Sequence, residues 1–209
     1  VKKHFEKEFE TNHLQKRISP ANKSKAKTIT LERPIQQAHL CTGTTTFSVH
    51  HPLRYSLLVL HTLLGDGMSS RLFQNIREKY GLAYTVYSFL NFMSDTSTFG
   101  VYIGTDAEKL ENAQELVQKE LEKFAAKPIT KQELARTKSQ LKGTMMLSLE
   151  SMSNRMMRLG SDELYFGAQT PLDTIRKRID EVTVESVLET AQKVIDINKF
   201  STVVMKPGK

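Results

Sequence analysis

Cysteine is nearly absent from this sequence of 209 residues, and Cys41, as the only one, excludes an internal disulfide. A lone cysteine in a predicted strand is expected to be a small buried hydrophobic residue. The scarcity of cysteine favours a reducing compartment such as the cytosol, while a periplasmic full-length protein stays open. The chain begins at Val1 rather than Met, so we expect it to be either an excised piece or a processed product of a longer protein.

Long hydrophobic runs and strong charge asymmetry in the body are also missing. No apolar run approaches the ~18 residues of a membrane-spanning helix, and no N-terminal stretch has the order of a signal peptide. The net charge is +7, but residues 1–33 carry nine Lys/Arg and four Glu, which leaves 21 basic against 19 acidic residues elsewhere. Because a nucleic-acid-binding protein shows a basic face in its folded body, we do not expect this chain to bind nucleic acid.

Common catalytic signatures are lacking too. The six histidines form no H-E-x-x-H, no H-x-x-E-H and no Cys/His pair with zinc spacing. We expect His4 with Glu8 to be a solvated pair and His50-His51 to be loop residues, although a site built from distant histidines stays open. The segment 65–70, "GDGMSS", follows a predicted helix rather than a strand, which argues against a phosphate loop. There is no G-x-S-x-G, so nothing indicates a serine nucleophile.

The first 27 residues differ from the rest of the chain. Residues 1–10 have apolar side chains four apart and predict a short amphipathic helix. Residues 11–27 are polar, basic and interrupted by proline, which predicts a linker. We therefore expect 1–27 to be the end of a preceding domain plus a basic inter-domain linker, and 28–209 to be one domain.

The remaining chain has strand and helix patterns in turn. Strands are predicted near 28–33 and 36–47, in a hairpin that turns at 94–96, and at 200–205. Amphipathic helices are predicted in 51–65, from Ser69 or Ser70 to Gly81, from Thr105 to Lys127, and at about 131–149, 151–166, 171–179 and 184–196. This order predicts an α+β fold, in two layers, with a mostly antiparallel sheet and helices packed on one face.

Local sequence also predicts helix caps and core positions. Two Thr/Glu pairs have the spacing of capping boxes: Thr105 with Glu108, and Thr130 with Glu133. Gly81 is the expected end of the helix before it. The methionine pairs at 145–146 and 156–157 are expected to fill the core or pack helices together.

Arg77 and Tyr84 are the remaining candidates for chemistry. Arg77 lies near the end of a predicted helix, and Tyr84 begins the strand beyond Gly81, so both side chains can project toward one spot. An arginine offers a rigid fork of donors for carbonyl or carboxylate oxygens, and a tyrosine hydroxyl can donate to an oxygen that becomes negative in acyl transfer. From the residues alone, an arginine that caps helix carbonyls and a tyrosine in a half-buried strand remain the simpler interpretation.

A resemblance reverses that balance. The stretch "LGDGMSSRLFQNIREKYGLAYTVYS" closely resembles the hallmark segment in the second half of the pitrilysin/insulinase family of inverted-zincin metallopeptidases, which includes the mitochondrial processing peptidases. Its most specific part is R-x-x-x-G-L-A-Y, from Arg77 to Tyr84. The segments "ITKQELARTKSQLKGTMMLSLES", "RLGSDELYFG" and "VTVESVLETAQKVI" agree in order, so the resemblance covers about residues 28–205.

The resemblance implies a zinc peptidase built from two related α+β halves. One half carries zinc on H-x-x-E-H, and this chain resembles the other, zinc-free half. Arg77 is then expected to hold substrate backbone, and Tyr84 to hydrogen-bond the scissile carbonyl or its oxyanion. Zinc and the glutamate base are expected in a partner half or a sister subunit, so this chain alone is expected to be inactive.

Three points stay open from the sequence. The chain is either the second half of a single protein or a separate non-catalytic subunit, and a homo-oligomer is not excluded. The alternative function is a structural subunit derived from the same family, as some relatives have lost peptidase activity. An H-x-x-E-H within the preceding ~200 residues, about one domain, or in a neighbouring gene would favour the peptidase.

Overall fold

The computed structural model of the chain describes residues 25–208. The helix predicted at 1–10 and most of the linker predicted at 11–27 lie outside these residues. None of the helices within the described range combines the length and apolar character that crossing a bilayer requires.

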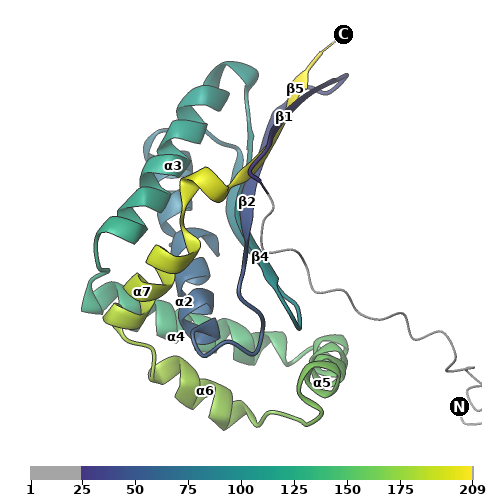
Figure 1. Cartoon of the computed structure of the whole chain (residues 1–209), viewed down its shortest axis with the longest axis vertical. Coiled ribbons are helices and arrows are strands. Elements are labelled where there is room, and N and C mark those ends of the chain that lie inside the picture. Colours follow the sequence, from purple (N-terminus) through teal and green to yellow (C-terminus); the bar gives the residue numbers. More distant parts are fainter. Residues whose placement is uncertain (1–24, 209) are drawn as a thin grey trace, which may run out of the picture.

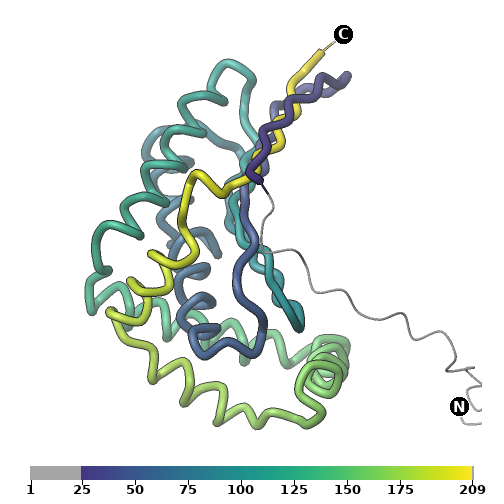
Figure 2. Tube along the Cα trace, viewed as in Figure 1, coloured from purple at the N-terminus to yellow at the C-terminus, as the bar shows by residue number. Residues whose placement is uncertain are grey.

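One five-stranded sheet forms the centre of the fold, in the order β1-β5-β2-β4-β3. Its strands are β1 (Thr28–Arg33), β2 (Ala38–Thr46), β3 (Thr85–Phe92), β4 (Ser97–Thr105) and β5 (Ser201–Pro207). The pairs β2–β4, β2–β5 and β3–β4 are antiparallel, and β1 runs parallel to β5. Figure 2 shows this parallel pair as the purple and yellow strands that run side by side near the C-terminus.

The helices form a second layer on one face of the sheet, as Figure 1 shows. They are α2 (Arg54–Gly65), the π-helix η2 (Phe73–Lys79), α3 (Leu110–Ala126), α4 (Lys131–Ser148), α5 (Met152–Phe166), α6 (Leu172–Asp180) and α7 (Val184–Val194), with short turns η3 (Ala107–Lys109) and η4 (Ile197–Lys199). The predicted two-layer α+β fold with a mostly antiparallel sheet is thereby confirmed.

The core lies between the two layers. Alternation along β4 turns Phe99, Val101 and Ile103 toward the helices, where all three are fully buried. The apolar stripe predicted for α2 meets them from the other side, with Leu57 and Leu60 also fully buried. The sequence pattern identified this core because the strand period of two and the helix period of 3.6 both survive in the fold.

Cys41 is exposed, so its predicted burial was wrong. Its neighbours Leu40 and Thr42 are buried, as is Ala38 on the same face of β2. Successive side chains of a strand point to opposite faces, and the helices cover the face of Leu40 and Thr42. Cys41 therefore points away from the core, on the face that no described helix covers.

Two capping boxes were predicted, and one is confirmed. At α4, Thr130 Oγ1 accepts from the Glu133 backbone N–H at 3.1 Å, and Glu133 Oε2 accepts from the Thr130 N–H at 2.9 Å. At Thr105 the predicted box was wrong, because Thr105 is the last residue of β4 and its hydroxyl donates to the Leu82 carbonyl. The helix predicted to start at Ser69 or Ser70 begins at Arg71, and the Ser70 hydroxyl donates to the Gly67 carbonyl at 2.7 Å instead of capping it.

The methionine pairs were predicted to fill the core or pack helices together, but they do not lie in the core. Met146, Met156 and Met157 are all exposed. The two on α5 are exposed because this helix lies at the edge of the helical layer (Figure 1), and the only residue it buries is Asp162.

Candidate functional site

The segment from η2 to β3 is built around one tight reversal. Ile76 is fully buried and fixes the helix on the core. Gly81 adopts a φ of +59°, a conformation that disfavours side chains with a Cβ. The backbone N–H of Gly81 donates to the Arg77 carbonyl at 3.1 Å, and that of Leu82 donates to the Ile76 carbonyl at 2.9 Å. The chain therefore leaves the helix in a fixed direction toward β3.

The helix that carries Arg77 is a π-helix from Phe73 to Lys79. π-Helices are rare and occur often at functional sites. Arg71, just before it, donates to Glu133 of α4 at 2.8 Å and stacks over the ring of Phe124 on α3. These contacts hold the start of the helix against the helical layer.

Arg77 itself is exposed. Its guanidinium carbon lies 5.0 Å from the centre of the Phe73 ring, one turn earlier. Among residues 25–208, no acidic side chain lies within ion-pair distance of it. Its hydrogen-bond donors are thus available to a partner from outside this part of the chain.

Tyr84 lies directly before β3 and is 51% exposed. Its backbone N–H donates to the Gly104 carbonyl at 2.9 Å, which extends the ladder between β3 and β4 by one residue. Its hydroxyl donates to Asp106 Oδ1 at 2.9 Å. Asp106 in turn forms an ion pair with Lys109 at 3.1 Å. The phenol, the carboxylate and the ammonium therefore form a chain of three linked groups at the surface.

The charge states of Tyr84, Asp106 and Lys109 follow from the hydrogen bonds among them. The bond to Asp106 raises the pKa of Tyr84 above its usual value near 10. The hydrogen bonds from Lys109 and then from Tyr84 lower the pKa of Asp106, and Asp106 raises the pKa of Lys109. At neutral pH Tyr84 is consequently a neutral hydrogen-bond donor beside an ionised carboxylate.

The structure places Arg77 and Tyr84 on the two sides of the Gly81 reversal, and both are exposed. Asp106 and Lys109 are part of the same site and were missed. The signal that could have identified them is "GTD" at the end of a predicted strand. It was assigned to a helix cap at Thr105 instead.

The described histidines are engaged with neighbouring side chains or backbone. His39 Nδ1 lies 2.7 Å from the Tyr102 hydroxyl, and His61 Nδ1 lies 2.7 Å from the Ser88 hydroxyl. The ring of His50 contacts Phe166 edge-on, and Nδ1 of His51 accepts from the Leu53 N–H at 3.1 Å. His4 and His13 lie outside the described residues.

No three His, Cys, Asp or Glu side chains in residues 25–208 converge as a metal site requires. The residues in this part of the chain therefore do not fit zinc.

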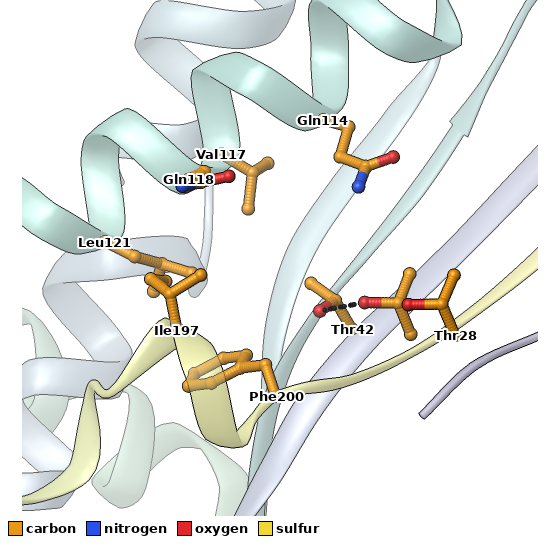
Figure 3. A pocket seen from close by; sticks show the side chains of 9 residues that line it. Thr28, Thr42, Gln114, Val117, Gln118, Leu121, Ile197 and Phe200 are labelled. Carbon is orange, nitrogen blue, oxygen red and sulfur yellow. Dashed lines mark hydrogen bonds between the residues drawn. The ribbon is translucent and has the colours of Figure 1, made fainter. Parts of the chain in front are cut away.

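A cavity of about 200 Å³ lies between α3 and the sheet (Figure 3), and neither Arg77 nor Tyr84 is among the residues that line it. Gln114 and Gln118 line it from α3, and on the sheet side the hydroxyls of Thr42 and Thr202 are hydrogen-bonded to each other at 2.8 Å. None of its lining side chains is an ordinary acid or base near neutral pH, so this cavity offers no general acid or base for catalysis.

Fold and site together define a two-layer α+β domain that presents two exposed hydrogen-bond donors, Arg77 and Tyr84, and has no metal centre among residues 25–208. The sequence model of the family described as "Peptidase M16 inactive domain" matches residues 1–141. The chain therefore belongs to the peptidase M16 family, as its inactive domain. The family predicted from the R-x-x-x-G-L-A-Y stretch is confirmed.

Curated relatives agree with this assignment. The chain is 42% identical over 159 residues to the uncharacterized zinc protease YmxG of Bacillus subtilis, a match that covers 76% of this chain and 39% of that protein. It is 36% identical over 177 residues to the uncharacterized zinc protease Rv2782c of Mycobacterium tuberculosis, with 85% and 40% covered. The matched part of the chain thus spans about two fifths of the length of these relatives.

Solved structures show the same fold. A peptidase M16 inactive domain from Pseudomonas fluorescens superimposes with a TM-score of 0.79 at 27% identity, covering 88% of this chain and 44% of that one. A protease from Helicobacter pylori gives a TM-score of 0.78 at 25% identity and covers 99% and 50%.

Proposed function

We propose that this chain is the substrate-binding, zinc-free half of a zinc metallopeptidase, with Arg77 and Tyr84 as the residues that contact the peptide. The observation that carries the proposal is the pair of exposed donors on either side of the Gly81 reversal, in a domain of the M16 family. The names of the relatives, all zinc proteases, support peptide-bond hydrolysis as the reaction.

Tyr84 is proposed to donate a hydrogen bond to the scissile carbonyl. The negative charge on that oxygen grows in the transition state, and a fixed donor stabilises it more strongly there than in the substrate. The phenol is protonated at neutral pH, as this role requires, since its usual pKa lies near 10 and the bond to Asp106 raises that pKa further. The residue's position, fixed by the backbone bond to Gly104, supplies the pre-organisation that such a donor needs.

Arg77 is proposed to position the substrate backbone. Its planar guanidinium can donate two parallel hydrogen bonds to carbonyl oxygens of an extended peptide. Stacking on Phe73 restricts the side chain without using its donors. Zinc and the general base are proposed to belong to the partner half, which is either the N-terminal half of the same protein or a sister subunit.

The deciding experiment is hydrolysis of a quenched fluorescent peptide library by this chain, by the zinc-bearing half, and by the two mixed. Activity only in the mixture would support the proposal. Association of the two halves without activity would favour the structural-subunit alternative. Zinc-dependent activity of this chain alone would contradict it, and would point to a metal site that includes residues outside 25–208.

A further inference from the structure

The Tyr84 phenol has a single proton, and this structure shows where that proton is used. The hydroxyl donates it to Asp106 Oδ1 at 2.9 Å. A hydroxyl has one donor, so Tyr84 cannot fully donate to Asp106 and to a substrate oxygen at the same time. Engagement of a substrate carbonyl by Tyr84 therefore requires that the bond to Asp106 be given up.

The backbone keeps the two residues opposed. Tyr84 is tied to β4 by its N–H bond to the Gly104 carbonyl, and Asp106 follows β4 by one residue. The hydroxyl of Thr105 binds the Leu82 carbonyl and closes the same corner. The phenol and the carboxylate are thus held near each other by β-sheet geometry, while the Tyr84 side chain remains half exposed.

Lys109 contacts the same carboxylate as Tyr84. Its ammonium lies 3.1 Å from Asp106 Oδ2, the oxygen that Tyr84 does not use. A cation on a carboxylate weakens the other hydrogen bonds that this carboxylate accepts, since it draws away negative charge. It also satisfies the carboxylate once the phenol has left.

On the basis of the proposed function, we propose that Asp106 is a positioning residue that withholds the Tyr84 hydroxyl until substrate displaces it, and that Lys109 sets how firmly it is withheld. A plain structural role of the Asp106–Lys109 ion pair would make loss of either partner act in the same direction. If Asp106 withholds the Tyr84 hydroxyl, removal of Asp106 and removal of Lys109 change the activity in opposite directions, because Asp106 binds the hydroxyl and Lys109 weakens that bond.

The kinetic test uses the assembled enzyme. Asp106→Ala is expected to raise kcat/KM about two- to fivefold, the range expected for loss of one exposed polar contact. Lys109→Met is expected to lower kcat/KM by a similar factor, and the double variant to behave like Asp106→Ala. Asp106→Asn, which keeps an acceptor oxygen without the charge, should fall between wild type and Asp106→Ala. Asp173→Ala, which breaks an exposed ion pair on α6, serves as the control.

A second readout does not depend on activity. The pKa of Tyr84 can be followed in this chain by NMR of labelled tyrosine, with Tyr84→Phe used to assign the signal. Asp106→Ala should lower that pKa and Lys109→Met should raise it. An unchanged pKa in Asp106→Ala, or a change of kcat/KM in any pattern other than opposite directions, would overturn the inference. Failure of the proposed function appears separately, as full activity of the Tyr84→Phe enzyme.

Discussion

Gly65, the last residue of α2, lies against Ser88 of β3 so closely that a Cβ at Gly65 would be 2.2 Å from the Ser88 backbone nitrogen. This contact brings the central helix directly onto the sheet. Only a glycine permits it, because the atom in the way belongs to the backbone and cannot rotate aside.

We expect Gly65→Ala to destabilise the protein by about 3 kcal/mol, the upper end of the usual cost of overpacking. The strand or the helix must move to admit the methyl group. Urea unfolding would measure the loss. Gly143→Ala is the matched control, since its Cβ would meet no atom within 4 Å inside α4, and it should gain roughly 0.5–1 kcal/mol. Equal effects of the two variants would contradict the close approach.

His61 gives the fold a dependence on pH. Burial lowers the pKa of this histidine below its usual value near 6.5, and its Nδ1 is bonded to the Ser88 hydroxyl. The unfolded chain therefore binds more protons than the folded one in the interval between the two pKa values. The contribution of neutral His61 to the free energy of unfolding is complete above pH about 6.5, and it is lost as the pH falls through the lower pKa of the folded state.

We expect the free energy of unfolding to fall between pH 7.5 and pH 5.5, with a slope of at most ~1.4 kcal/mol per pH unit from this one group. Urea unfolding at several pH values, compared with His61→Gln, would isolate it. His50→Gln, an exposed histidine on Phe166, should keep the wild-type dependence. If His61→Gln had the same pH profile as the wild type, the pH dependence of stability would have to come from another group.

Local patterns in the sequence were enough to predict the two layers of this fold, but they could not predict which strands pair and in which direction. Alternation in β4 and the stripe on α2 predicted which side chains meet in the core. The parallel pairing of β1 with β5 joins residues such as Thr28 and Thr202, and no local pattern distinguishes it from antiparallel pairing. The prediction that Cys41 is buried was wrong for the same reason, because its burial depends on which face of the sheet the helices cover.

The candidate site shows the same division. Arg77 and Tyr84 were found from a motif, because their spacing is short and local. Asp106 was missed because its role depends on where β4 ends, and that end is fixed by the contacts of Thr105 and Gly104 with the segment around Leu82 and Tyr84. The π-helical geometry around Arg77 was missed as well, since residue propensities do not separate it from an α-helix.

Arg77→Ala in the assembled enzyme is expected to raise KM about tenfold or more with a smaller change of kcat, because the donors it removes position the substrate backbone in both ground and transition states. Arg77→Lys keeps the charge and loses the planar fork, so it should recover only part of the loss. Steady-state kinetics with one cleavable peptide would decide. Arg136→Ala, an exposed arginine on α4, is the control, and unchanged constants for Arg77→Ala would remove it from the site.

Tyr84→Phe tests the donor that the proposed reaction needs most. Loss of one donor to a developing oxyanion lowers kcat by about ten- to a thousandfold. KM should change little, because the hydrogen bond strengthens mainly in the transition state. The ring is retained, and Tyr84 is held by its backbone bond to Gly104 rather than by its hydroxyl, so the fold should be unaffected. Tyr80→Phe, an equally exposed tyrosine four residues earlier, is the matched control. A near-normal kcat for Tyr84→Phe would show that some other group stabilises the oxyanion, and would leave this domain with substrate positioning through Arg77 as its contribution.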